Sequence, residues 1–245
     1  MKILVAGGTG ATGQHLVRQL LERGHDVEII VRTPEKLPET IRTHKNISII
    51  TATILDMSDV DMAQHVNECD AVVSCLGHML SFHGIFGHPR RLVTESVRRL
   101  CQAVQANKPT TRVNFVLMNS AGCRNQDVPE IISFSQHCVI GLLRLLLPPH
   151  VDNEKAADYL RTAIGQNHPA IEWAVVRPDN LIDDNSVSPY TVHASPIRSA
   201  IFDAGTTSRI NAAHFMADLI TDPAIWFQWK GKMPVIYNNL IDRDG

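Results

Sequence analysis

The amino-terminal stretch combines a short apolar run with closely spaced glycines, and this combination constrains the fold more than any other feature of the sequence. The run KILVA (residues 2–6) is followed at once by GGTGATG. Two overlapping patterns lie there, GxxGxxG at Gly7, Gly10 and Gly13 and GxGxxG at Gly8, Gly10 and Gly13. Between a buried strand and a helix, such glycines predict a tight turn whose bare backbone contacts a pyrophosphate, because a Cβ atom would block the approach. A tight turn without a ligand is the alternative.

Apolar runs of strand length alternate with helical patterns along the rest of the chain. The expected strands lie at residues 2–6, 26–31, 47–52, 70–77, 112–122, 171–178 and 233–238. The expected helices lie near residues 12–23, 89–107, 152–166 and 211–222, with a short helical stretch after residue 52. Several runs are apolar at every position, as in parallel strands covered on both faces. The alternation predicts an α/β fold with a doubly wound, mostly parallel sheet, a Rossmann fold, as one domain over residues 1–245.

Composition excludes several classes of protein. The formal net charge is -2, so no basic field favours nucleic acid as a partner. Glycines interrupt the first apolar run too early for a secretory signal, and the apolar stretch at residues 138–149 is too short to span a membrane. The 5 cysteines form no CxxC pattern, which is typical of reduced thiols. We therefore expect a cytoplasmic protein with neither nucleic acid nor a membrane as partner.

The end of the second expected strand predicts which dinucleotide binds. An acid at this position accepts hydrogen bonds from the ribose 2′-OH of NAD, whereas Arg32 here suits the 2′-phosphate of NADP. Lys36 adds a second positive charge, and Thr9 and Thr12 add hydroxyl donors near the start of the first helix, which favours negative charge. The prediction is NADP(H) as cofactor. A solvated pair of cations is the alternative.

Two further strand ends are placed to meet the dinucleotide. Asp56 follows the third expected strand and can accept a hydrogen bond from the adenine amino group; a helix N-cap is the alternative. Cys75, Leu76 and Gly77 close the fourth strand, where the chain passes close to the cofactor.

With these features the sequence resembles the atypical short-chain dehydrogenase/reductase superfamily, and more narrowly the NmrA-like group and the small flavin reductases, or biliverdin-IXβ reductases. The matching stretches, which run to about Ala217, are GGTGATGQ, VRTPEKL, ILDMSDVD, DAVVSCLG, LMNSAG, DYLR, IEWAVVRPDNLIDD, YTV and SRINAAHFM. The resemblance implies that the pyrophosphate is held by Gly7, Thr9, Gly10, Ala11, Thr12 and Gly13. It implies further contacts of the 2′-phosphate with Arg32 and Lys36, of adenine with Asp56 and Met57, and of the dinucleotide with Leu76 and Gly77.

The resemblance also implies an active-site serine at Ser120, beside Asn119. Its hydroxyl can polarise a substrate carbonyl or bind the nicotinamide amide; a strand-end hydroxyl that satisfies the backbone is the alternative. Lys155 can contact the nicotinamide ribose or replace a missing donor. A solvated lysine in the first turn of a helix is the alternative.

Two departures from the family pattern bear on the substrate. The YxxxK pattern of carbonyl reductases is absent, since none of Tyr159, Tyr190 and Tyr237 is followed four residues later by lysine. The histidines that flank the substrate pocket of flavin reductases are also absent, with Asn153 and approximately Asp179 in their places. Without a positioned acid, ordinary ketone reduction is disfavoured, whereas a conjugated ring spreads the charge that hydride brings.

The sequence thus favours an NADP(H)-dependent oxidoreductase that hands hydride to a conjugated small molecule, such as a flavin, a quinone or a tetrapyrrole. The alternative is a non-catalytic, NmrA-like sensor of the NADP(H) redox state that binds a protein partner. An epimerase or lyase that retains its cofactor is a third interpretation, which the absent tyrosine also weakens.

Three further features are left over. His78, His83 and His88 recur at a spacing that suits neither a helix face nor a strand face, so we expect a glycine-rich loop at the rim of the active site and no metal site. A solvated helix face is expected for Arg90, Arg91, Arg98 and Arg99. The apolar part (residues 131–151) of a substrate-covering segment around residues 123–151 is expected to pack over the nicotinamide side, with a homodimer contact as the alternative.

Overall fold

The computed structural model describes residues 1–78, 87–130 and 133–239. The strands are β1 (Lys2–Ala6), β2 (Asp26–Val31), β3 (Ile47–Thr51), β4 (Ala71–Ser74), β5 (Val113–Met118), β6 (Ile171–Pro178), β7 (Asn180–Ile182), β8 (Tyr190–His193), β9 (Thr206–Ser208) and β10 (Val235–Asn238). The helices are α1 (Ala11–Glu22), α2 (Glu39–Arg42), α3 (Asp59–Val66), α5 (Leu92–Asn107), α6 (Phe134–Leu146), α7 (Pro148–Tyr159), α8 (Arg209–Thr221) and α9 (Pro223–Trp229).

The described strands form an 8-stranded sheet in the order β3-β2-β1-β4-β5-β6-β10-β8, and a separate pair, β7 and β9. All neighbours in the large sheet are parallel except β10 and β8. The order reverses between β1 and β4, which is the switch point at which doubly wound sheets bind ligands beyond the carboxyl ends of their strands. The predicted single-domain, doubly wound, mostly parallel fold is confirmed.

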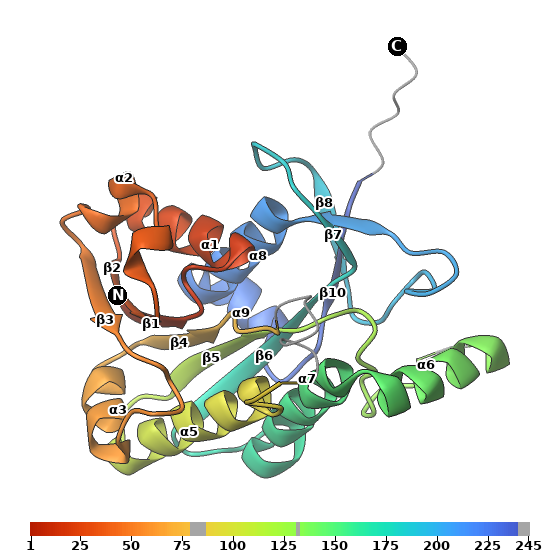
Figure 1. Ribbon diagram of the computed structural model, residues 1–245, viewed down its shortest axis with the longest axis horizontal. Helices are drawn as coiled ribbons and strands as arrows, with labels where there is room; N and C mark the ends of the chain where they lie inside the picture. Colours follow the sequence, from red (N-terminus) through yellow and green to blue (C-terminus); the bar gives the residue numbers. More distant parts are fainter. Residues whose placement is uncertain (79–86, 131–132, 240–245) are drawn as a thin grey trace.

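The central strands are mostly apolar because both faces of the sheet are covered (Figure 1). Ile3 and Val5 of β1 pack in the core under α1, α8 and α9, whereas Leu4 and Ala6 pack in the core on the α3, α5 and α7 side. None of these four side chains is more than 1% exposed. Because successive strand residues point to opposite faces, an unbroken apolar run is what this three-layered arrangement requires.

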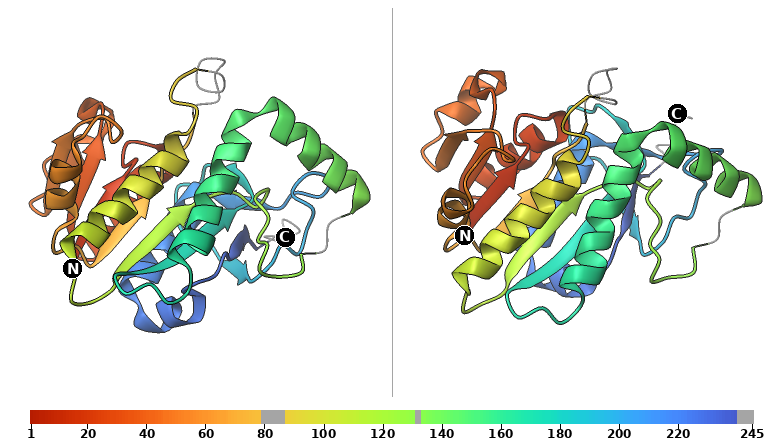
Figure 2. Two further views of the ribbon diagram at one scale, coloured as in Figure 1. Left: turned by 90° about the horizontal axis from the view of Figure 1, so that it is seen from below. Right: turned by 60° about the horizontal axis from the view of Figure 1, so that its bottom comes forward.

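Helices α5 and α7 lie side by side across one face, and α6 extends from them away from the sheet (Figure 2). Helix α7 begins at Pro148, before the predicted start near Asp152, because a proline is tolerated in the first helical turn. Its last turn continues as a π-helix (Leu160–Ile164).

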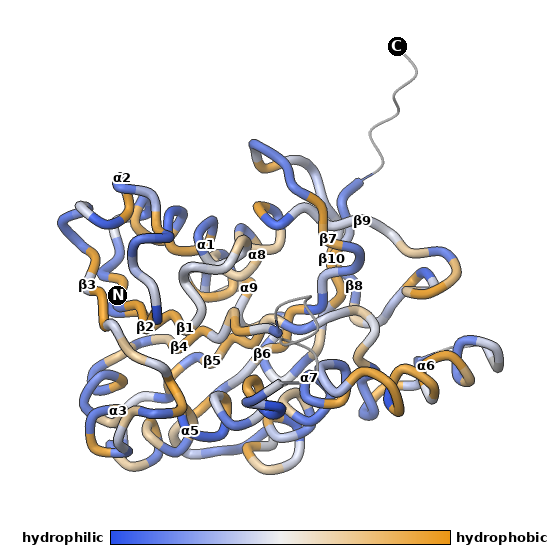
Figure 3. The backbone as a smooth tube through the Cα atoms, viewed as in Figure 1, coloured by the Kyte–Doolittle hydropathy of each residue, from blue (hydrophilic) through white to orange (hydrophobic). Residues whose placement is uncertain are grey.

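Helix α6 forms most of the described part of the apolar segment (residues 131–151), for which no element type was predicted, and the first residues of α7 form its end. Its outward side exposes Leu142, Leu145 and Leu146, the second by 79%, and Figure 3 shows the apolar colouring along the helix. That this segment covers the nicotinamide, or forms a subunit contact, stays a prediction. In the described parts of the chain, no helix combines the length and the apolar character needed to cross a membrane.

Candidate functional site

The glycine loop after β1 is shaped so closely around its neighbours that two glycines leave no room for a side chain. Gly7 has a φ of +86°, and a Cβ on it would lie 2.8 Å from the carbonyl carbon and oxygen of Cys75. A Cβ on Gly13 would lie 2.2 Å from the carbonyl oxygen of Gly7. Gly10 closes the turn by donating its N–H to that same oxygen at 3.0 Å. The turn therefore brings the start of α1 directly over the end of β1.

The N-terminus of α1 fits a phosphate group. Its N-cap, Gly10, has no side chain to bind the free N–H groups, and its first turn contains no acidic residue. Gly10 and Ala11 are exposed, whereas Thr12 and Gly13 are buried. Uncapped N–H groups and the helix macrodipole together favour an anion at this position.

Gln14 ties the glycine loop to the loop after β2, although its role was not predicted. Its side-chain amide donates to the carbonyl oxygens of Thr9 at 3.0 Å and of Lys36 at 3.3 Å. The structure thus brings the loop that carries Arg32 and Lys36 beside the glycine loop. Both cations are exposed, and neither forms an ion pair with any residue that the structure describes. They are available to a phosphate.

The segment between β3 and α3 carries Asp56 and Met57. Asp56 is exposed, and Met57 packs partly against the core. The N-cap of α3 is Ser58, whose hydroxyl accepts from the N–H of Asp61 at 3.1 Å. The alternative interpretation of Asp56 as that N-cap is therefore wrong.

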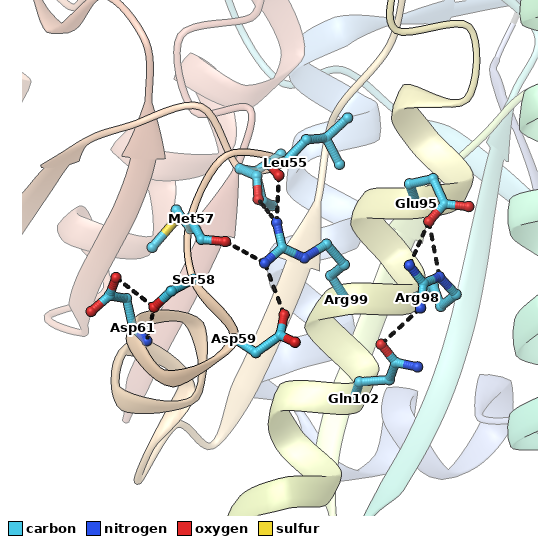
Figure 4. A network of polar contacts seen from close by, with 10 residues as sticks. Leu55, Met57, Ser58, Asp59, Asp61, Glu95, Arg98, Arg99 and Gln102 are labelled. Atoms are coloured by element: carbon cyan, nitrogen blue, oxygen red, sulfur yellow. Dashed lines mark hydrogen bonds and ion pairs between the residues drawn. The ribbon is translucent and has the colours of Figure 1, made fainter.

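The expectation of a solvated face for the arginines of α5 is wrong for Arg99. Its side chain is only 13% exposed, and its guanidinium binds the backbone carbonyls of the segment before α3 (Figure 4). Arg99 lies three residues after Ser96 and four before Ala103, which are both buried. That helical spacing is the signal that places Arg99 on an inward face of α5.

The end of β4 forms a wall next to the glycine loop. The N–H of Cys75 donates to the carbonyl oxygen of Ala6 at 2.9 Å, which extends the pairing of β4 with β1. Burial raises the pKa of the Cys75 thiol to about 12, so the thiol stays protonated and unreactive and only packs against its neighbours. Leu76 and Gly77, which follow it, are partly buried and exposed, respectively.

Ser120 is placed by the end of β5. The hydroxyl oxygen of Ser120 accepts from the N–H of Gly122 at 3.2 Å, which leaves its own hydrogen free to be donated. Asn119 is buried, and its side-chain amide donates to the carbonyl oxygen of Asn153 at 2.9 Å. Its carbonyl oxygen accepts from the N–H of Ser120 at 2.9 Å. Asn119 thereby links Ser120 to α7.

The remaining polar candidates are Lys155 and the three tyrosines, which differ in how exposed they are. Lys155 is exposed on α7, as in the solvated alternative, and no described ion pair engages it. Tyr159 packs against the core that contains α5, and Tyr190 binds His214. Tyr237 of β10 is buried in one cluster with Ala121, the residue after Ser120. Burial is the first cause that raises the pKa of each tyrosine. Of the three tyrosines, Tyr237 is thus the one that packs beside the strand end that carries Ser120.

Asp152 is a buried carboxylate that the sequence analysis missed. Its side chain is 1% exposed, and it accepts from the N–H groups of Val93 at 2.8 Å and Thr94 at 3.1 Å. The Nε2 atom of His78 lies 2.8 Å from the same carboxylate. Asp152 therefore caps α5 from outside, where its own N-cap, Arg91, makes no capping bond. It also holds the end of β4 against α7.

A second buried pair anchors the start of the segment around residues 123–151. Arg177, at the carboxyl end of β6, is fully buried and lies 2.7 Å from the carboxylate of Glu130. It also donates to the carbonyl oxygens of Cys123 at 2.9 Å and Met233 at 2.7 Å. Neither Arg177 nor Glu130 was a candidate, because charged residues are seldom buried and the pairing depends on the fold.

The predicted substrate-side position Asp179 has structural partners. Asp179 is 7% exposed and accepts from the N–H groups of Asn180 and Gly205, and burial raises its pKa.

Among the described residues no group of histidines, cysteines and acids is arranged to hold a metal ion. His88 is exposed, and His83 lies outside the described residues.

Comparison with known proteins identifies the family to which the chain is similar. A model of the NAD(P)H-binding family matches residues 7–223. A chloroplastic protein of Arabidopsis thaliana is 26% identical over 183 residues, which cover 75% of this chain and 60% of that protein. The 3-diazoavenalumate denitrifying reductase of a Streptomyces species is 33% identical over 110 residues, 43% of this chain and 34% of that enzyme. The chain thus matches less than two thirds of either relative's length.

Solved structures share the fold. An oxidoreductase of Lactococcus lactis has a TM-score of 0.68 at 16% identity, over 97% of this chain and 91% of that one. A short-chain dehydrogenase/reductase of Veillonella parvula in complex with NADP has a TM-score of 0.69 at 15% identity, over 97% and 94%. A protein of Streptococcus pneumoniae proposed to be an NADH-flavin reductase has a TM-score of 0.64 at 18% identity, over 97% and 99%.

Proposed function

The chain belongs to the NAD(P)H-binding family, and on this premise we propose that it is an NADP(H)-dependent oxidoreductase of the atypical short-chain type. We propose that it transfers hydride to a flat, conjugated small molecule of the flavin, quinone or tetrapyrrole kind. The observation that carries the proposal is the open anion site formed by the uncapped start of α1 together with the unpaired Arg32 and Lys36.

The choice of the phosphorylated cofactor rests on charge. Arg32 directly follows β2, which pairs with β1, so it stands one strand away from the glycine loop. Arginine binds phosphate through a planar fork of donors, and the 2′-phosphate distinguishes NADP(H) from NAD(H). No acidic side chain occupies the strand end, so nothing there favours a ribose 2′-OH.

The nature of the acceptor rests on the hydroxyl groups of the site. The bound nicotinamide supplies the hydride, and the chain's residues orient the two rings and exclude water. Ser120 donates a single hydrogen bond toward the acceptor or the nicotinamide amide, while Asn119 fixes the serine relative to α7. None of the three tyrosines stands in a YxxxK pattern, which favours an acceptor that needs no strong acid. The names of the Streptomyces and Streptococcus proteins are consistent with reductive chemistry.

The proposal is tested by measuring NADPH oxidation with riboflavin, flavin mononucleotide, simple quinones and biliverdin as acceptors. We expect turnover with at least one of them, and slower turnover with NADH. Ser120→Ala should lower kcat on the order of a hundredfold, as loss of one oriented donor does, with the Kd of NADPH unchanged. Ser48→Ala, which changes an exposed serine of β3, is the matched control and should behave as the wild type.

A redox sensor is the second candidate. The absence of the YxxxK pattern favours it, because a sensor needs no proton donor. The exposed leucines of α6 also favour it, because a sensor needs a surface for its partner. Tight NADPH binding without turnover on any of these acceptors would favour the sensor and contradict the oxidoreductase.

A further inference from the structure

Arg99 of α5 binds the backbone of the segment between β3 and α3 with an unusual number of contacts (Figure 4). Its Nη1 atom donates to the carbonyl oxygens of Ile54 at 2.9 Å and Leu55 at 2.7 Å. Its Nη2 atom donates to the carbonyl oxygen of Met57 and to the carboxylate of Asp59 at 2.9 Å. One side chain thus holds three carbonyl groups of a stretch that has no regular secondary structure.

The carbonyl contacts, and not the ion pair, define what Arg99 does. Asp59 is 95% exposed, so solvent screens its attraction to the guanidinium. Arg99 is 13% exposed, and hydrogen bonds from a largely buried cation to carbonyl oxygens are stronger than neutral ones. The planar guanidinium presents its donors in a fixed arrangement, so it also sets the spacing of the three carbonyls.

Besides the packing of Ile54, Leu55 and Met57 with the core, the segment has few other hydrogen-bond restraints among the described residues. One turn is closed by the N–H of Asp56, which donates to the carbonyl oxygen of Thr53 at 2.9 Å, and the segment ends at the Ser58 cap of α3. Asp56 itself is exposed, and no ion pair of the described residues engages it. Its position relative to the sheet edge therefore depends on how the carbonyls around it are held.

We propose that Arg99 is a positioning residue for the adenine end of the dinucleotide. By holding the backbone on both sides of Asp56, it keeps Asp56 and Met57 at the place where adenine binds. The inference rests on the proposed function and deepens it, since it assigns cofactor affinity to a residue that does not contact the cofactor. The competing explanation is that Arg99 only braces α3 against α5.

The test compares variants at two adjacent arginines of the same helix. Arg99→Ala removes all the carbonyl contacts, and Arg99→Lys keeps the charge but not the planar fork. Arg98→Ala is the matched control, because among the described residues the Arg98 side chain binds Glu95 and Gln102 of α5 itself and no other. Dissociation constants are measured by calorimetry with three probes: NADPH, adenosine 2′,5′-bisphosphate, which is the adenine end alone, and reduced nicotinamide mononucleotide, which lacks that end.

Arg99→Ala should weaken NADPH and adenosine 2′,5′-bisphosphate by the same factor of about ten, which corresponds to a binding-competent segment populated about one tenth of the time. Reduced nicotinamide mononucleotide should bind Arg99→Ala as it binds the wild type. Arg99→Lys should lie closer to Arg99→Ala than to the wild type, and it carries the test if the alanine variant does not fold. Arg98→Ala should match the wild type with all three probes.

Two results would overturn the inference alone. Unchanged affinity of the folded Arg99 variants for the adenine-containing probes would show that the segment needs no positioning. An equal loss for reduced nicotinamide mononucleotide would show that Arg99 only braces the fold. A wild-type protein that binds none of the three probes would contradict the proposed function instead, and the two failures are therefore distinguishable.

Discussion

Arg32, which follows β2, and Arg99, which lies on α5, differ in exposure and in the partners that they already have. Arg32 is exposed and unpaired within the described chain, so its charge is available to a ligand. Arg99 is nearly buried and already bound to carbonyl oxygens, so its charge serves the protein. Residue type alone does not separate these roles, whereas burial and existing partners do.

At this scale Arg32→Ala tests the preference for the phosphorylated cofactor. The loss of a charge-assisted contact of about 1.5–3 kcal/mol should weaken NADPH by about ten- to a hundredfold and leave NADH nearly unchanged. Calorimetry with both cofactors measures the ratio. Arg42→Ala, at an exposed arginine of the nearby α2, should change neither affinity. Equal losses of NADPH and NADH would refute the assignment of the 2′-phosphate to Arg32.

At the scale of elements, close packing explains why glycines occur where they do. Gly13 lies in the first turn of α1, where a Cβ would collide with the carbonyl oxygen of Gly7 at 2.2 Å. Gly141 lies within α6 with no atom within 4 Å of such a Cβ. The first glycine is required by the contact of helix and strand, and the second only costs helix propensity.

These two glycines give opposite predictions for the same substitution. Gly13→Ala should lower the free energy of unfolding by about 1–3 kcal/mol, as overpacking does. Gly141→Ala should raise it by roughly 0.5–1 kcal/mol, because alanine favours a helix. Urea unfolding of both variants measures the changes. A stabilised Gly13→Ala would show that α1 can move away from β1 without cost.

The buried pair of Arg177 and Glu130 holds the loop after β5 against the end of β6. Glu130→Ala should lower the free energy of unfolding by about 3–5 kcal/mol, because it leaves a buried guanidinium without its counter-ion. Asp203→Ala is the control: it breaks the exposed Arg198–Asp203 pair, which solvent screens, and should cost far less than Glu130→Ala. Similar losses in the two variants, measured by thermal or urea unfolding, would mean that the buried pair holds no more than a surface pair.

At the scale of the whole molecule, the signals that are local in sequence predicted the fold, and the contacts between distant segments escaped prediction. Strand–helix alternation and the glycine spacing lead to the observed sheet, because each depends on neighbouring residues. The contact of His78 with Asp152 joins positions 74 residues apart, and those of Arg99 span 40 to 45. The spacing of residues along the sequence predicts contacts between near neighbours only, so it could not predict these contacts. Helix α6 was not assigned because its second half is a nearly continuous apolar run, and such a run does not by itself indicate whether it forms a helix or a strand.

The stability of the whole molecule should also depend on pH through Glu154. Burial by itself would raise the pKa of this carboxyl, but hydrogen bonds and charge from His150 and Arg144 lower it from 4.5 to about 2. Because the pKa is lower in the folded protein than in the unfolded chain, the ionised carboxyl stabilises the folded state at pH values above the pKa of the unfolded chain. This contribution is lost as the pH falls from about 4.5 to about 2. Glu154→Gln should therefore flatten the decline of the free energy of unfolding in that window. An identical decline in the variant and the wild type would contradict the assignment.

The central claim of the account is that a dinucleotide lies with its pyrophosphate at the uncapped start of α1 and its 2′-phosphate at Arg32. A crystal structure of the wild-type protein grown with saturating NADP⁺ tests it most directly. The account predicts pyrophosphate oxygens within hydrogen-bond distance of the N–H groups of Ala11 or Thr12, and the 2′-phosphate against the Arg32 guanidinium. A dinucleotide bound elsewhere, or an α1 terminus without phosphate at saturation, would contradict it.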